Sequence, residues 1–213
     1  MLSEMKVTDL LKRTASSDPV PGGGSMSALA AAVAASLVEM VANLTIGRKG
    51  FEGVEEEMKT VCREASHYRE KFTEAIDRDS EAYAKVLAAF RMPKNTETEK
   101  EVRAQAVQEA FRSAAEVPLS VAEAVLGFMP LAQAAVEKGN PNACTDGLVG
   151  VMMARTGALG ALHNVKINLG SINDNTYVTA ISRRVQKIEN LVIQMEQEVL
   201  GKAASQQTEI SSS

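Results

Sequence analysis

The stretch PVPGGGSMSALAAAVAAS, residues 19–36, places three consecutive glycines directly before a segment made mostly of alanine. Glycine permits sharp turns and close approach to the backbone, and alanine has the highest intrinsic helix propensity. The stretch therefore predicts a loop that runs into a helix of small cross-section over residues 25–46. At helical spacing this helix has a bulky stripe and a nearly smooth one, and the smooth one consists of Ala28, Ala32 and Ala35, continued by Glu39 and Asn43.

Apolar residues recur at helical spacing along the rest of the chain, with almost no sign of strands. The expected helices cover residues 3–13, 25–46, 54–90, 96–138, 141–168 and 176–204. Two overlapping capping boxes in TETEKE (96–101) start the fourth helix, and Pro118 kinks or divides it. Residues 14–24 are expected to form a loop and residues 205–213 a frayed tail. No linker separates two composition regimes. We therefore expect one all-α domain over residues 1–204, an antiparallel bundle of long helices.

Composition narrows the class of protein. The 213 residues are 45% hydrophobic and 23% charged, which is typical of a soluble globular domain. A net charge of −4 argues against a nucleic-acid partner. Two cysteines and an N-terminus without a signal-peptide pattern indicate a reduced, cytoplasmic setting. Residues 25–46 are apolar enough to raise the question of a membrane span, but polar residues interrupt them, so we expect a buried core helix.

A second smooth face is expected on the helix at residues 141–168. It consists of Gly147, Gly150, Ala154, Gly157 and Ala161, with Asp146, Asn164 and Asn168 at its edge or in continuation of it. Two smooth faces allow tight helix packing, or they leave room for something flat. Both interpretations stay open at this point.

A carboxylate interrupts the apolar seam of the longest expected helix. The seam consists of Val54, Met58, Val61, Ala65, Tyr68, Phe72, Ala75, Val86 and Phe90. Asp79 lies in the middle of it, with Tyr83 one turn further on, whereas Asp77 points elsewhere and is expected to be solvated. Since a buried carboxylate is costly unless it is paired or used, Asp79 is either structural, as an ion-pair partner or a cap to a neighbouring helix, or a functional group.

Other candidate sites are weaker. His67 and His163 have no carboxylate or cysteine at ligand spacing, so no metal site is predicted. The GGGS stretch lacks the Lys and the preceding strand of a phosphate-binding loop, although a helix N-terminus still offers free N–H groups. Arg48 and Lys49 form a small exposed basic pair.

Three segments together carry a resemblance to a known family. They are PVPGGGSMSALAAAVAASLVEMVANLTIGRKGF (19–51), DRDSEAYAKVLAAFRMPK (77–94) and GNPNACTDGLVGVMMARTGALGALHNVKINLGSI (139–172). In this order they resemble the C-terminal domain family of formiminotransferase-cyclodeaminase, which includes stand-alone methenyltetrahydrofolate cyclohydrolases. The resemblance covers about residues 5–200. It implies an all-α homodimer that acts on the one-carbon unit bridging N5 and N10 of tetrahydrofolate.

The resemblance and the residue pattern together suggest a folate site. Asp79 is the expected catalytic acid/base, and Asp146 is the second candidate, as orienting group or second acid/base. A tetrahydrofolate derivative would be the substrate, and no metal or redox cofactor is expected. The expected substrate-binding residues are Gly22, Gly23, Gly24, Ser25, Asn43, Arg48, Lys49, Tyr83, Asn142, Asn164 and Asn168. Among them, Arg48 and Lys49 could attract the anionic glutamate tail of folate.

Several alternatives stay open. Hydrolysis of 5,10-methenyltetrahydrofolate to 10-formyltetrahydrofolate is the main hypothesis, and a cyclodeaminase that releases ammonia is the alternative. A non-catalytic folate-binding bundle and a nucleotide-binding protein are further candidates. An expected seam on the last helix, consisting of Ile181, Val185, Ile188, Val192, Met195 and Val199, needs a partner within the chain or from a second copy. With the resemblance, this seam favours a homodimer.

Overall fold

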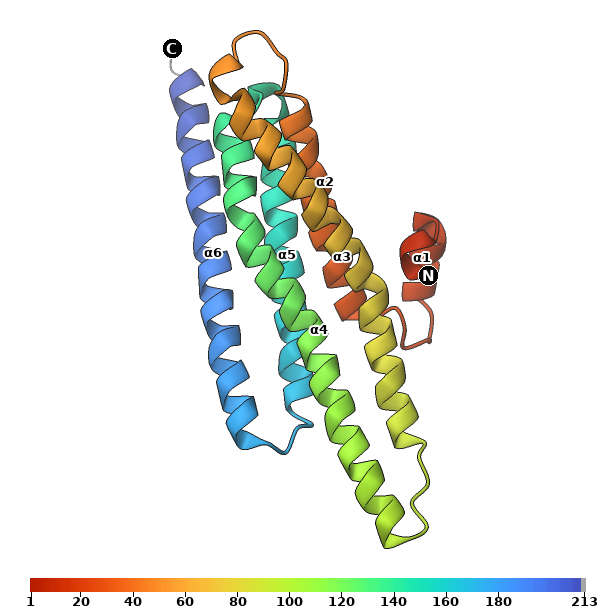
Figure 1. Cartoon of the computed structure of the whole chain (residues 1–213). Helices are drawn as coiled ribbons and strands as arrows, with labels where there is room; N and C mark the ends of the chain where they lie inside the picture. The colour runs from red at the N-terminus through yellow and green to blue at the C-terminus, as the bar shows by residue number, and fades with distance from the viewer. Residues whose placement is uncertain (212–213) are drawn as a thin grey trace.

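The computed structural model describes residues 1–211, which form helices and no strand. In chain order the elements are η1 (Leu2–Glu4), α1 (Val7–Thr14), α2 (Gly23–Asn43), η2 (Glu52–Val54), α3 (Glu55–Phe90), α4 (Glu97–Lys138), η3 (Pro141–Ala143), α5 (Cys144–Leu169) and α6 (Asn175–Ser211). The expected all-α fold of long helices is confirmed (Figure 1).

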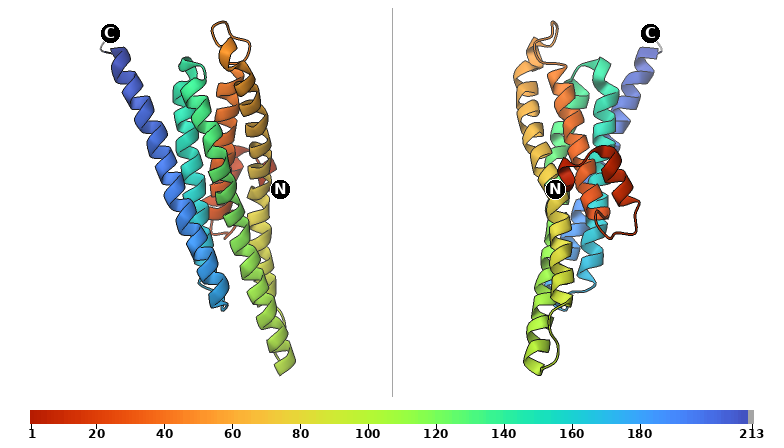
Figure 2. Two further views of the ribbon diagram at one scale, coloured as in Figure 1. Left: turned by 60° about the vertical axis from the view of Figure 1, so that its left-hand side comes forward. Right: turned by 90° about the vertical axis from the view of Figure 1, so that its right-hand side faces the viewer.

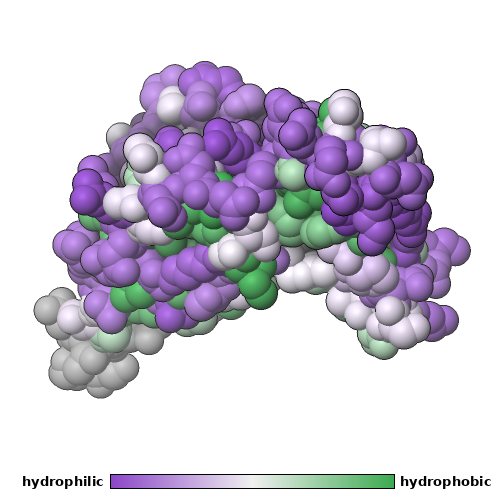
Figure 3. Space-filling view, turned by 90° about the horizontal axis from the view of Figure 1, so that it is seen from below, coloured by the Kyte–Doolittle hydropathy of each residue, from purple (hydrophilic) through white to green (hydrophobic). Residues whose placement is uncertain are grey.

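Four of the long helices form the body of the bundle. α2 packs against α3 and α5, and α4 packs against the same two helices from the other side. α6 covers α4 and α5 from outside, and the ends of α3 and α4 project beyond the other helices as a hairpin (Figures 1 and 2). From the hairpin end the surface is hollowed and shows apolar areas within a mostly polar exterior (Figure 3).

The core lies where α3 and α4 face α2 and α5. Its largest fully buried side chains are Phe72, Phe128, Met58, Met129 and Leu162. Phe72 and Phe128 meet edge to face, with ring centroids 6.3 Å apart, and Tyr68 contacts both rings. Most of the seam expected on residues 54–90 is therefore buried, although Phe90 is exposed where the hairpin leaves the bundle.

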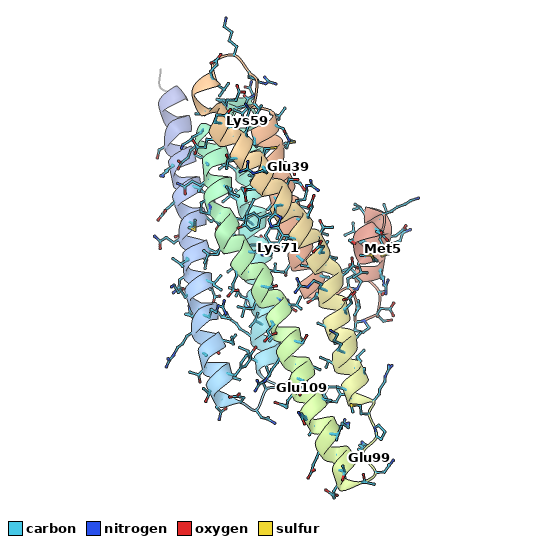
Figure 4. All side chains as sticks on the ribbon, viewed as in Figure 1. Met5, Glu39, Lys59, Lys71, Glu99 and Glu109 are labelled. Carbon is cyan, nitrogen blue, oxygen red and sulfur yellow. The ribbon has the colours of Figure 1, made fainter. Side chains whose placement is uncertain are left out.

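The smooth face of α5 packs directly against α2, on the side of Ser27 and Ala34. The smooth face of α2 is also buried, but its continuation, Glu39 and Asn43, is bonded to α3. A Cβ at Gly157 would lie 2.8 Å from the Ser27 carbonyl oxygen, and one at Gly150 would lie 3.4 Å from that of Ala34. The alternative of tight helix packing is therefore correct there, because backbone already fills the space. Glu39 does not continue a ligand face: it accepts a 2.7 Å hydrogen bond from Arg69 Nε of α3 (Figure 4).

Several boundaries differ from the sequence prediction. The expected first helix is divided into η1 and α1, and α2 begins two residues earlier and ends three residues earlier than predicted. The expected capping box at the start of α4 is present: the Glu99 N–H donates to Thr96 Oγ1 and the Thr96 N–H donates to the Glu99 carboxylate. Residues 205–211 continue α6 rather than fraying, and residues 212–213 of the expected tail lie outside the described residues.

Pro118 does not divide α4, which runs unbroken through it. A proline inside a helix leaves the carbonyl four residues earlier without its usual donor. Here that carbonyl belongs to Ala114, and it accepts a 2.9 Å hydrogen bond from Asn168 Nδ2 of α5. A side chain from a neighbouring helix thus satisfies the acceptor that the proline leaves open.

The apolar seam of α6 finds its partner within the chain. Val185, Ile188, Val192 and Val199 are buried against α4 and α5. The seam therefore gives no support to a homodimer, and the intramolecular alternative is the correct one for this surface.

The expectation that Asp77 is solvated is wrong. Asp77 is only 7% exposed and accepts hydrogen bonds from the Leu2 N–H and the Ser3 hydroxyl, each at 2.5 Å. Although burial would raise the pKa of this carboxyl, the bonds from Ser3 and Leu2 outweigh burial and hold the pKa below its ordinary value. Asp77 therefore fastens the N-terminal segment to α3.

Two helices, α2 and α4, are long and apolar enough to cross a membrane by length and composition alone. In the bundle, 61% of the most apolar window of α2 and 50% of that of α4 are buried. For α2 this burial agrees with the expected role of a core helix.

Candidate functional site

A pocket of about 220 Å³ lies where α2 begins and α5 ends. α3 contributes Asp79 and Tyr83 to its wall, α4 contributes Ala114, and the loop before α2 contributes Pro19 and Val20. The remaining lining residues are Gly22, Gly23, Gly24, Ala82, Asn164, Ile167 and Asn168. The tertiary structure thus brings together most of the residues that the sequence nominated for the start of α2, the middle of α3 and the end of α5.

Asp79 is the only carboxylate among the residues that line this pocket. Ser25 Oγ lies 3.0 Å from Asp79 Oδ2 and 2.9 Å from the Ile76 carbonyl oxygen. When Asp79 is ionised, the hydroxyl donates to the carboxylate. When Asp79 carries a proton, the carboxyl can donate to Ser25 Oγ while the hydroxyl turns to the Ile76 carbonyl. The same contacts therefore accommodate both protonation states.

Burial raises the pKa of the Asp79 carboxyl above its ordinary value, and hydrogen bonds from the Ser25 hydroxyl and backbone N–H partly oppose this effect. None of the ion pairs in the described part of the chain involves Asp79. The ion-pair alternative is therefore wrong, whereas the cap alternative agrees with the bonds that Ser25, in the first turn of α2, donates to Asp79 through its hydroxyl and backbone N–H. A carboxyl with a raised pKa in a pocket is suited to exchange a proton with a ligand.

The glycines give Asp79 its space. A Cβ at Gly24 would overlap the Asp79 carboxylate, and one at Gly23 would lie 3.2 Å from Asn164 Nδ2. Gly22 also lines the pocket. The run of glycines therefore lets the first turn of α2 approach two polar side chains closely, which a larger residue would prevent.

Two asparagines from the end of α5 line the pocket. Asn168 Nδ2 donates to the carbonyls of Ala114 and Asn164, both at 2.9 Å, which uses both of its N–H groups. Asn164 Nδ2 donates to the Gly160 carbonyl at 2.9 Å. These bonds orient the amides, so that their oxygens remain as acceptors for N–H groups of a ligand.

Because Pro118 leaves the Ala114 carbonyl open for Asn168, we expect Pro118→Ala to disturb the pocket with only a small change in stability. The new N–H competes for the carbonyl, so Asn168 is less well held. The gain in helix stability is offset by about 1–2 kcal/mol of lost packing, because Pro118 is buried. We expect KM for the substrate to rise roughly threefold to tenfold, as steady-state kinetics would measure. Pro130→Ala is the matched control, since Pro130 is an exposed proline of the same helix. Equal KM values for both variants would contradict this role.

Five nominated residues lie away from the pocket. Asn43, Arg48, Lys49, Asn142 and Asp146 lie at the far end of α2 and the start of α5, where Asn140 bonds to Leu44 and Thr45. Asp146 and Asn164 are 18 residues apart on α5, which is about 27 Å of helix. Within one chain, Asp146 therefore cannot act beside Asp79. Asn43 instead accepts a 3.3 Å hydrogen bond from Cys62 Sγ.

Sequence reasoning missed the apolar side of the pocket. Pro19, Val20, Ala82, Ala114 and Ile167 line it without carrying a chemical group. For Ala114 a signal existed, because Pro118 four residues later marks its carbonyl as lacking a helical donor. No group of three or more His, Cys, Asp or Glu side chains within the described residues could hold a metal ion.

Fold and pocket define a class of protein: an all-α bundle with one half-buried carboxylate in a small pocket. A sequence profile of the formiminotransferase-cyclodeaminase family matches residues 6–187. A methenyltetrahydrofolate cyclohydrolase of Methylorubrum extorquens is 36% identical over 192 residues, 90% of this chain and 91% of that protein. The chain belongs to the formiminotransferase-cyclodeaminase family.

Two further relatives have other names. The formimidoyltransferase-cyclodeaminase of Mus musculus is 32% identical over 88% of this chain, which spans 35% of that longer protein. The crystal structure of a formiminotetrahydrofolate cyclodeaminase from Thermotoga maritima superposes with a TM-score of 0.85 at 27% identity, covering 96% of this chain and 98% of that one. The whole bundle, rather than one motif, is therefore shared.

Proposed function

We propose that this folate one-carbon enzyme hydrolyses 5,10-methenyltetrahydrofolate to 10-formyltetrahydrofolate, with Asp79 as the acid/base. The observation that carries the proposal is the half-buried Asp79 carboxyl in the pocket, with a raised pKa and a serine that suits both of its protonation states. The full-length similarity to a methenyltetrahydrofolate cyclohydrolase supports this choice of substrate.

The proposed chemistry needs one proton carrier. The ionised Asp79 stabilises the cationic amidinium of the substrate and takes a proton from the water that attacks the methenyl carbon. A tetrahedral intermediate forms, and the carboxyl then returns the proton to N5 as the bond between that carbon and N5 breaks. As that bond breaks, the hydroxyl of the intermediate becomes the formyl carbonyl on N10 and its proton is released to solvent. No step requires a metal ion or a redox cofactor, and we expect none.

The substrate contacts follow from the pocket. The oxygens of Asn164 and Asn168 accept hydrogen bonds from N–H groups of the pterin, and Tyr83 provides a ring wall. Gly22, Gly23 and Gly24 let the ligand approach the backbone at the start of α2. In this assignment Ser25 orients Asp79 and does not touch the substrate.

A cyclodeaminase is the second candidate, favoured by the fold shared with the Thermotoga maritima enzyme. In that reaction N10 attacks the formimino carbon on N5, and ammonia leaves after protonation, which the same carboxyl can provide. Purified protein assayed side by side with 5,10-methenyl- and 5-formimino-tetrahydrofolate decides between the two. Turnover of the methenyl substrate alone supports the proposal, release of ammonia from the formimino substrate supports the alternative, and folate binding without turnover indicates a binding protein.

We further propose that the protein is a cytoplasmic homodimer. The support is an apolar face on the outside of α2 and α5, consisting of Leu29, Val33, Leu37, Met40, Leu44, Val149 and Met152, all half-buried or exposed. An exposed apolar surface of this extent is typical of a protein interface. Light scattering at micromolar concentration tests the proposal, and a monomeric mass would refute it.

A further inference from the structure

The pocket is small for the ligand that the proposed function assigns to it. Sites that enclose a drug-sized molecule usually hold about 300–1,000 Å³, whereas this one holds about 220 Å³. It contains one acidic group and no lysine or arginine, although the glutamate tail of a folate carries carboxylates. One chain therefore supplies a place for the reacting rings but no cation for the tail.

Two basic side chains that could bind these carboxylates lie at the other end of the bundle. Arg48 and Lys49 are exposed in the turn after α2, and neither forms an ion pair in the described part of the chain. Gly47 and Gly50 flank this pair in the sequence, and both have positive φ angles, 71° and 92°. The Gly50 N–H also donates a 2.9 Å hydrogen bond to the Glu52 carboxylate. The turn is thus built to present two side chains, but about 30 Å of α2 separates it from Gly23.

The apolar face of α2 and α5 joins these two ends. It runs along α2 to Leu44, four residues before Arg48. At the other end, Ile167 of α5 lies on the same exposed side as Val149 and Met152, is 75% exposed and lines the pocket. A molecule that covers the face therefore reaches the mouth of the pocket.

A second copy of this chain is the occupant that fits the face. Two helices about 30 Å long and about 10 Å apart give a footprint on the order of 600 Å² in plan, comparable to the roughly 800 Å² that a partner contributes to a stable interface. Closed symmetry brings the same face of both copies together, with their helices either parallel or antiparallel. Parallel copies would place the two basic turns beside each other, whereas antiparallel copies place each basic turn beside the acidic pocket of its partner.

We propose that two copies pack antiparallel through this face, and that Arg48 and Lys49 of the partner subunit complete the Asp79 pocket by binding the carboxylates of the folate tail. This inference rests on the proposed function. It also brings the nominated residues that lie away from the pocket close to those that line it. In the antiparallel dimer, the start of α5, which carries Asn142 and Asp146, lies near the pocket of the partner subunit.

Mixed dimers test the proposal. One chain carries Asp79→Asn, and the other carries Arg48→Ser with Lys49→Ser, on an exposed turn where neither side chain supports the fold. Each is expressed alone, and both are co-expressed with different tags and purified through both. We expect the first homodimer to be nearly inactive and the second to have KM raised about tenfold. The mixed dimer has one complete site, so it shows wild-type KM and half the wild-type kcat per dimer.

Three outcomes would overturn the proposal: a mixed dimer that keeps the raised KM, a double serine variant with wild-type KM, or a monomeric wild-type protein. If the wild-type protein turns over neither folate substrate, the proposed function fails, and the arrangement is judged separately. A spin label on Lys49→Cys, with Cys62→Ser and Cys144→Ser, gives about 40 Å between copies when they are antiparallel and less than about 25 Å when they are parallel. The shorter distance rejects the shared pocket.

Discussion

Asp79→Asn is expected to lower turnover at least roughly 100-fold while the protein stays folded. Asparagine keeps the volume of the side chain and accepts a hydrogen bond from Ser25, but it can neither take nor return a proton. General acid/base groups typically contribute about 10²–10⁴-fold in rate. Single-turnover measurements on 5,10-methenyltetrahydrofolate, with circular dichroism to verify folding, would check this result.

The difference in stability between wild type and Asp79→Asn is expected to depend on pH. Since burial raises the folded-state pKa of Asp79, its contribution to stability is fully present below the unfolded pKa and is lost as pH rises through the raised folded pKa. Asparagine does not titrate, so wild type should lose stability relative to Asp79→Asn between about pH 4 and pH 7. Urea unfolding at both pH values measures this difference.

Glu81→Gln is the matched control for the Asp79 substitution, because Glu81 is an exposed acid on the same helix, half a turn away. It should leave turnover unchanged. Near-normal turnover by Asp79→Asn would make Asp79 a structural residue. Asp146, which the antiparallel arrangement places near the partner's pocket, would then become the leading acid/base.

Gly24→Ala is expected to lower turnover about as strongly as the loss of the carboxylate itself. The added Cβ overlaps the Asp79 side chain, so the carboxylate must turn away and lose its bonds to Ser25. Moving a short side chain on a packed helix should also cost about 1–3 kcal/mol of stability. Steady-state kinetics and thermal unfolding measure the two effects.

Gly53→Ala controls for the general effect of adding a methyl group to a helical glycine. No atom lies within 4 Å of a Cβ at this position, so turnover and stability should stay near wild type. If Gly24→Ala retains full turnover with unchanged stability, the close approach of α2 to Asp79 has no role in the chemistry.

The sequence by itself determined the helical architecture. Apolar spacing predicted the long helix at residues 54–90 almost to its ends, and the capping box fixed the start of α4. These signals are local, because caps and helical periodicity depend on residues a few positions apart. Asp79 was found in the same way, as a carboxylate on an apolar seam, and so were the glycines at residues 22–24.

Only the tertiary structure determined which residues and helix faces contact each other. Periodicity identifies an apolar face but not its partner, so the seam of α6 and the smooth face of α2 could equally have faced another copy or a ligand. Likewise Asp77 and Asp79 are two residues apart on α3, yet one fastens the N-terminus and the other faces the pocket. Which polar groups share a site depends on contacts between residues more than 50 positions apart, such as Ser25 with Asp79 and Ala114 with Asn168. Local sequence does not encode such contacts, because packing of the whole core selects them.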